Sequence, residues 1–156
     1  MNTLAKAPRA TIIPCLTYRD PRQAIDWLCS TFGFQQHSLH ADEHGNVVHA
    51  ELAFGHGMVM LGSADRDTPY GRLLTLPGEI WGRQTQTVYV VTDDVDEIHR
   101  RAHATGVEIV MPLEDHSYGG RGFSCRDLEG HVWSFGSYDP AQASQSHYVG
   151  ALSPTQ

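Results

Sequence analysis

The chain has 156 residues, a size typical of one domain or of two small modules that share a core. Apolar residues make up 40% of it and charged residues 19%, so it can bury a core and lacks the composition of disordered or collagen-like chains. The formal net charge of -7 argues against nucleic-acid binding, which needs a clustered basic surface to displace counterions from phosphate.

The cysteines and the chain ends predict a cytoplasmic protein that does not enter a membrane. Cys15, Cys29 and Cys125 form no C-x-x-C pair, so neither a disulfide framework nor a thiolate zinc site is expected. We interpret residues 1–10 as an N-terminal extension, because the apolar run after them is too short for a signal peptide or a membrane span. Residues 139–156 are polar and aperiodic, and we expect a poorly ordered tail there.

Two segments of the chain follow one plan of a strand, a helix and three more strands. The expected strands are 11–18, 34–41, 47–54 and 58–62 in the first segment, and 85–91, 107–113, 120–127 and 131–138 in the second. Both helices show an apolar stripe at helical spacing. Asp20 is expected to cap the first helix, and Asp93 or Asp94 the second.

The two segments align without a gap at an offset of 73 positions. This offset pairs Asp20 with Asp93 and Gly57 with Gly130, among other helix starts and punctuating glycines. It predicts an α+β protein made of two tandem βαβββ modules. The first module covers 11–62, the second covers 85–138, and residues 63–84 form the connector.

Strand alternation selects candidate ligand-binding residues in each module. Along 47–54, one expected face is Val48, Ala50, Leu52 and Phe54, and the other is Val47, His49, Glu51 and Ala53. We expect the first of these faces to pack on the helix, so His49 and Glu51 point toward the concave side of the sheet.

The last two strands provide a second group of candidates. Ser124 and Arg126 share a face of one strand, while Ser134 alternates with Trp133 and Phe135, which are expected in the core. Arg126 is predicted either to meet an anionic ligand group or to pair with a nearby acid, such as Asp127 or Glu129.

The connector is long for a compact domain and rich in large apolar side chains. It is expected either to pack against a partner subunit or to form a lid that places Trp81 or Tyr70 over the ligand. His99 and His103 lie at i and i+4 on the second helix, but a protease-type zinc motif requires Glu where Arg100 stands. A solvated helix face is therefore expected for them.

The sequence resembles the vicinal oxygen chelate superfamily, in its glyoxalase/bleomycin-resistance-protein-like branch. The resemblance rests on PCLTYRDPRQAIDWLCSTFGF from Pro14, on VYVVTDDVDEIHRRAHATGV from Val88, and on RGFSCRDLEGHVWSFGSY from Arg121. It implies paired βαβββ modules with sheets curled around a cavity, usually in a homodimer. Metal-using members place one ligand on the first and one on the last strand of each module.

The matching positions here do not carry that ligand set. They are Ile13, Gln86 or Thr87, Leu61 and Ser134, and of these only Gln86 resembles a ligand of the family. A lone amide does not hold a transition metal, so we expect no metal and no other cofactor. The resemblance then favours the bleomycin-resistance proteins, which lack the ligands and bind a bulky drug between subunits.

The sequence therefore predicts a metal-independent small-molecule binding protein, a cytoplasmic homodimer without nucleic-acid or membrane partners, that sequesters an antibiotic or metabolite. Its ligand-binding residues are predicted to be His49, Glu51, Trp81, Ser124, Arg126 and Ser134. The alternative is a superfamily enzyme, a lyase or isomerase, that uses His49 and Glu51 as an acid-base pair or as a non-standard metal site. No catalytic residue is assigned, because nothing in the sequence positions a base beside Cys125.

Overall fold

Two four-stranded sheets form the framework of the computed structural model, which describes residues 10–65 and 67–142. The elements follow the predicted order, and the architecture is the expected α+β arrangement of tandem βαβββ modules. The predicted N-terminal extension, apart from Ala10, and most of the predicted tail lie outside the described residues.

The first module contains β1 (Cys15–Tyr18), α1 (Pro21–Trp27), the π-helical turn η1 (Leu28–Phe32), β2 (Gln35–Ala41), β3 (Val47–Phe54) and β4 (Gly57–Ser63). The second contains β5 (Val88–Val91), α2 (Val95–Ala104), β6 (Ile109–Asp115), β7 (Arg121–Arg126) and β8 (Val132–Gly136). Two short 3-10 helices, η2 (Gly71–Leu73) and η3 (Pro77–Ile80), lie in the connector. Strands β1 and β5 start later than expected, so Ile13 and Gln86 precede the strands instead of belonging to them.

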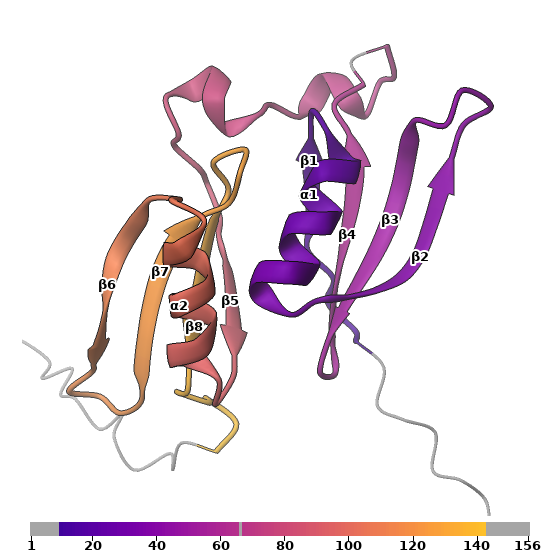
Figure 1. Ribbon diagram of the computed structural model, residues 1–156. Coiled ribbons are helices and arrows are strands. Elements are labelled where there is room, and N and C mark those ends of the chain that lie inside the picture. Colours follow the sequence, from indigo (N-terminus) through magenta and orange to yellow (C-terminus); the bar gives the residue numbers. More distant parts are fainter. Residues whose placement is uncertain (1–9, 66, 143–156) are drawn as a thin grey trace, which may run out of the picture.

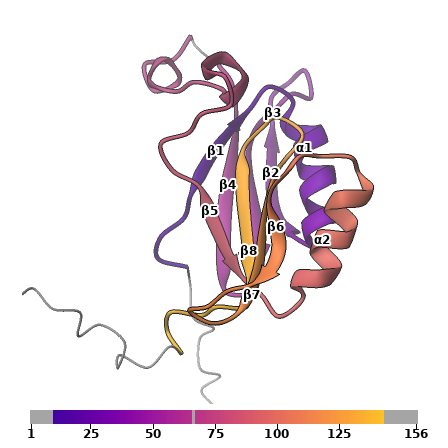
Figure 2. The same cartoon turned by 90° about the vertical axis from the view of Figure 1, so that its left-hand side faces the viewer.

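Each module has the same sheet topology, with strand orders β1-β4-β3-β2 and β5-β8-β7-β6. The first strand runs parallel to the last, and the other neighbours are antiparallel. The sheets stand side by side, with β1 and β5 as the facing edge strands (Figure 1). Helices α1 and α2 cover the same side of the two sheets (Figure 2), so the other side of each sheet is free of helices.

The predicted side-chain cap is present at the first helix. Asp20 accepts a hydrogen bond from the backbone N–H of Gln23 at 3.1 Å, as expected for a cap. Asp94 holds the N-cap position of α2, one residue later than the offset of 73 places it, but its side chain forms no capping hydrogen bond. Gly33 and Gly106 follow the ends of η1 and α2 with φ angles of 90° and 79°, which a residue with a side chain rarely adopts.

The ungapped offset fails in the last strand of each module, β4 and β8, which corrects the predicted equivalence of Leu61 and Ser134. Buried Ala50 pairs with Leu61, whereas Phe123, its equivalent 73 residues later, pairs with Phe135, which is 74 residues after Leu61. The turn from β3 to β4 has two residues and the loop from β7 to β8 has five, so the alternation shifts by one. Leu61 therefore belongs to the core, and Met60 and Gly62 lie on the helix-free face.

A bulge reverses the expected faces at the start of β3. Strand pairing with β2 passes from His40–His49 directly to Ala41–Val47, which leaves Val48 without a direct partner. As a result Val47 is buried and Val48 is 48% exposed, contrary to the predicted alternation. From His49 onward the prediction is correct, because Ala50 and Leu52 are fully buried.

The loop between β7 and β8 docks the second module on the first. The buried Asp127 carboxylate accepts hydrogen bonds from the Tyr18 hydroxyl at 2.6 Å and from the Trp133 indole N–H at 3.0 Å. The Glu129 carboxylate accepts from the backbone N–H groups of Arg19 and Asp20. Burial, followed by the charge of Asp127, raises the pKa of Tyr18 well above its ordinary value, so its hydroxyl stays protonated and donates.

One hydrophobic core extends across both modules. The ring of Phe32 lies 5.5 Å from that of Trp133 and 4.5 Å from that of Phe135, and all three side chains are fully buried. The ring of Phe34 contacts Trp133 at 5.5 Å. The prediction that Trp133 and Phe135 belong to the core is confirmed.

Replacing Tyr18 by Phe should destabilise the protein by about 1–3 kcal/mol, because Asp127 stays buried with one donor fewer. The measurement is urea unfolding at neutral pH, with Tyr118→Phe as control, since Tyr118 is 67% exposed. Equal midpoints for the two variants would contradict the role assigned to this bond.

Candidate ligand-binding site

The helix-free face of the first sheet carries two rows of side chains. Residues that pair directly on neighbouring strands share a face, so the register defines each row. The rows are Cys15–Met60–Glu51–Ser38 and Thr17–Gly62–His49–His40. Polar and ionisable groups therefore gather toward β2 and β3, and smaller or apolar ones toward β1 and β4.

A pocket of about 480 Å³ opens on this face. Its floor comes from β1, β3 and β4, and the connector closes it with Tyr70 and Leu74. Among the described lining residues Asp65 is the single acid, and none is Lys or Arg. A neutral or cationic molecule of drug-like size fits this combination of volume and charge.

His49 and Glu51 come together as predicted from strand alternation. His49 lines the pocket, and its Nε2 atom lies 3.3 Å from Oε1 of Glu51. The second carboxylate oxygen lies 3.9 Å from Nε2 of His37 on β2. The buried Ser38 hydroxyl across the strand pair, and next the His49 ring, hold the pKa of Glu51 below its ordinary value, although Ser38 forms no hydrogen bond of standard geometry. The carboxylate is thus an anion at neutral pH.

Ser124 and Ser134 come together on the helix-free face of the second sheet. They are directly paired, and their hydroxyl oxygens lie 2.7 Å apart. The described pocket on the first sheet does not include them. A single chain therefore presents two separate groups, an ionisable one on the first sheet and a neutral one on the second.

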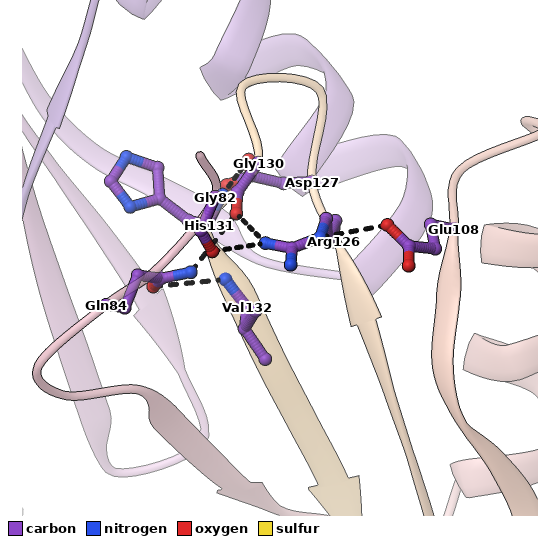
Figure 3. A network of polar contacts seen from close by, with 8 residues as sticks. All are labelled: Gly82, Gln84, Glu108, Arg126, Asp127, Gly130, His131 and Val132. Atoms are coloured by element: carbon purple, nitrogen blue, oxygen red, sulfur yellow. Dashed lines mark hydrogen bonds and ion pairs between the residues drawn. The ribbon is translucent and has the colours of Figure 1, made fainter. Parts of the chain in front are cut away.

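Arg126 ties the connector to the second module (Figure 3). Its guanidinium donates to Glu108 at 2.9 Å and to the carbonyls of Gly82 and Gly130 at 3.0 and 2.9 Å. Its acidic partner is thus Glu108, which corrects the expected pairing with Asp127 or Glu129. The latter two acids are used in docking the modules.

Trp81 lies at the end of η3 and outside the pocket of a single chain. It is 88% exposed and has a φ of 55°, which is uncommon for a residue with a large side chain. Tyr70, the other aromatic residue proposed for a lid, does line the pocket.

Several pocket residues were not among the predicted candidates. They include Thr17, Met60, Gly62 and Asp65, together with Leu74 of the connector. Alternation along β1 and β4 carried a signal for the first three. The shifted register of β4 relative to β8 concealed this signal, because the offset of 73 made Leu61 the equivalent of Ser134.

The residues at the family's metal positions do not fit a divalent ion. The observed register makes Met60, not Leu61, the equivalent of Ser134, and a thioether is a poor ligand for a hard divalent ion. The Ser134 hydroxyl is hydrogen-bonded to Ser124, and Ile13 offers no donor side chain. Within residues 10–65 and 67–142, no group of three or more His, Cys, Asp or Glu side chains is arranged to hold a metal.

The one buried cysteine is not a nucleophile. Cys125 is fully buried in the core, and burial raises the pKa of its thiol to about 12. The thiol is therefore protonated at neutral pH, and it faces away from the helix-free side of the sheet.

Comparison with known proteins agrees with this architecture. Residues 10–135 match the family described as the Glyoxalase/Bleomycin resistance protein/Dioxygenase superfamily. The chain belongs to this superfamily. No protein of curated function is significantly similar to it in sequence.

Three solved structures illustrate the relationship. TioX from Micromonospora sp. ML1 is 38% identical in sequence, and the two structures superpose with a TM-score of 0.63. The match covers 80% of this chain and 95% of the TioX chain. The second is a point mutant of FosX, the fosfomycin resistance protein of Listeria monocytogenes, solved with Mn(II) and a dihydroxypropylphosphonic acid. It is 16% identical, with a TM-score of 0.60, and the match covers 83% of this chain and 93% of the FosX chain. A protein of unknown function from Agrobacterium tumefaciens is 21% identical over 86% and 98%, with a TM-score of 0.59. The last two share the fold alone.

Replacing Arg126 by Ala should loosen the connector, because two carbonyl contacts and an ion pair are lost together. Limited trypsin digestion should then cut after Arg83 several times faster than in the wild type. Arg100→Ala, which removes an exposed ion pair with Glu97 on α2, is the matched control. Equal cleavage rates for the wild type and the two variants would contradict the role of Arg126 in holding the connector.

Proposed function

We propose that this protein is a metal-independent small-molecule binding protein of the glyoxalase/bleomycin-resistance type that sequesters an antibiotic or metabolite. The observation that carries the proposal is the pocket on the first sheet, which has room for a ligand and is lined by His49. Glu51 lies next to this histidine, outside the lining, and the family's metal ligands are missing. The likeness to FosX concerns the fold and lends no support to a phosphonate substrate.

We propose that the protein acts as a homodimer. The helix-free faces of both sheets are open in one chain, and exposed apolar side chains lie on them, including Val48, Tyr89 and Met111. Exposed apolar surface of this kind is a common feature of interfaces and ligand sites. Pairing with a second copy would bring the serine pair of one sheet over the His49–Glu51 pair of another. In this arrangement Trp81 of one chain contacts the partner chain or a ligand bound to it, and not the pocket of its own chain.

The proposed location is the cytoplasm. Cys15, Cys29 and Cys125 are all free thiols, as is usual in a reducing compartment. In the part of the chain that the structure describes, no helix is long and apolar enough to cross a membrane.

A second candidate function is a superfamily lyase or isomerase. The arrangement His37–Glu51–His49 favours it, because a carboxylate between two imidazoles can orient one of them as a general base. Binding is the leading proposal, because His49 is the one of these three residues that lines the pocket.

Replacing Glu51 by Gln should lower the affinity for cationic aromatic ligands about ten-fold, because a partly screened carboxylate close to the ligand is lost. Neutral ligands of the same shape should be unaffected in isothermal titration. Asp26→Asn on α1 removes the same charge from the helix side and is the matched control. An equal loss of affinity for cationic ligands in both variants would show a general effect of protein charge. Unchanged affinity in both variants would show that the ligand does not bind near Glu51.

Elemental analysis of dialysed protein should find no stoichiometric zinc, nickel, iron or manganese. One metal ion per chain that disappears in Glu51→Gln or His49→Ala would instead support the enzyme. A metal ion that remains bound in both variants would contradict both proposals, the metal-independent binding protein and the enzyme with a metal at His49 and Glu51.

A further inference from the structure

The turn that carries Trp81 is closed by hydrogen bonds of its own. The Glu79 carboxylate accepts from the backbone N–H of Leu76 at 3.0 Å, across the start of η3. The backbone N–H of Gly82 donates to the carbonyl of Pro77 at 2.7 Å, across the end of η3. Leu76 and Pro77 are buried, so the turn is packed on the protein and does not stand free.

The chain after Trp81 is fixed to the second module (Figure 3). Arg126 donates to the carbonyl of Gly82 at 3.0 Å. The side-chain amide of Gln84 donates to the carbonyl of Gly130 at 3.1 Å and accepts from the backbone N–H of Val132 at 3.2 Å. The position of Trp81 relative to the second module is therefore set within a single chain.

Trp81 has a backbone conformation that a large side chain disfavours. Its φ of 55° and ψ of 33° lie in the left-handed region, which glycine adopts far more readily. The side chain is 88% exposed and does not line the pocket, so the packing of one chain does not explain a tryptophan at this position. Backbone strain of this kind persists mainly where the strained residue serves a function.

We propose that Trp81 is the anchor through which one chain binds a second copy of itself. The inference rests on the homodimer of the proposed function and names the residue that holds it together. A rigid aromatic ring on a fixed turn loses little conformational freedom on binding, and tryptophan is enriched among the residues that dominate interface energies. Leu73 and Tyr70 of the same connector are 81% and 62% exposed and add apolar surface along this segment.

Charge favours a second copy over a small cationic ligand as the partner of Trp81. Arg83, two residues further on, is exposed, and its side chain forms no ion pair within residues 10–65 and 67–142. A cation beside the indole repels the cationic ligand that Glu51 is proposed to attract. A second copy carries 18 acidic and 11 basic residues, so it offers carboxylates to Arg83.

The test follows the fluorescence of Trp81 while the wild-type protein is diluted from dimer to monomer. Trp27 and Trp133 are buried, so Trp81 is the one exposed residue among the three tryptophans. Acrylamide should quench its emission in the dilute monomer and should lose this effect in the concentrated dimer. The dimer dissociation constant is measured on the same samples by sedimentation velocity.

Trp81→Ala and Trp81→Gly should each raise the dimer dissociation constant at least about thirty-fold, as expected for a dominant interface residue. Tyr118→Ala, which removes another exposed aromatic ring, is the matched control and should leave this constant nearly unchanged. Trp81→Gly should unfold at a higher urea concentration than Trp81→Ala, because glycine relieves the left-handed backbone. This order of midpoints separates the loss of the dimer from a loss of the fold.

An unchanged dimer dissociation constant in both Trp81 variants would overturn the proposal and leave the homodimer standing. A wild-type dimer in which acrylamide still quenches Trp81 would do the same. An equal increase of the constant in Tyr118→Ala, or a midpoint for Trp81→Gly at or below that of Trp81→Ala, would also overturn it.

Two further outcomes separate this inference from the proposed function. Weaker binding of cationic aromatic ligands by Trp81→Ala, with an unchanged dimer, would assign Trp81 to the ligand and overturn the inference alone. A wild type that stays monomeric would remove the homodimer together with its anchor, while ligand binding that depends on Glu51 would keep the binding function.

Discussion

The buried carboxylate of Asp127 is the contact on which the arrangement of the two modules depends. It belongs to the β7–β8 loop of the second module, yet one of its donors is Tyr18, at the end of β1 in the first. Such a buried anion is tolerated only with hydrogen-bond donors, so the loop has one low-energy position against the β1–α1 junction. That position brings Phe32 against Trp133 and Phe135, and one core then supports both sheets.

This shared core fixes where chemistry can occur. Both helices cover one side of the sheets, and the rows that contain His49, Glu51, Ser124 and Ser134 lie on the other side. The first sheet places an anion and imidazoles there, and the second places hydroxyls and aromatic rings. In the observed register Met60 and Ser134 hold equivalent places on these faces, and a thioether and a hydroxyl are weak ligands for a divalent ion. Recognition by shape and charge is what these side chains can provide.

Much of the fold could be predicted from periodicity, because helix stripes, capping residues and strand alternation are local and strong. His49 and Glu51 were grouped correctly for the same reason, since residues i and i+2 of a regular strand share a face. Ser124 and Ser134 lie on the two neighbouring strands β7 and β8, and alternation in each strand placed both on the same face. Prediction failed where one residue changes the register: a bulge exposes Val48, and unequal turns shift β4 against β8. The pairing of Arg126 with Glu108 depends on the register between the β6 and β7 segments, and the exposure of Trp81 depends on the path of the connector, which has no periodic signal.

The central claim is that the protein holds an organic ligand without a metal. Native mass spectrometry of protein purified from its own host tests it most directly, because the masses of the chain, of a bound molecule and of any metal are measured together. The account predicts a dimer that carries an organic adduct, which is released on denaturation, and no metal. A bound divalent ion without any organic molecule would contradict it.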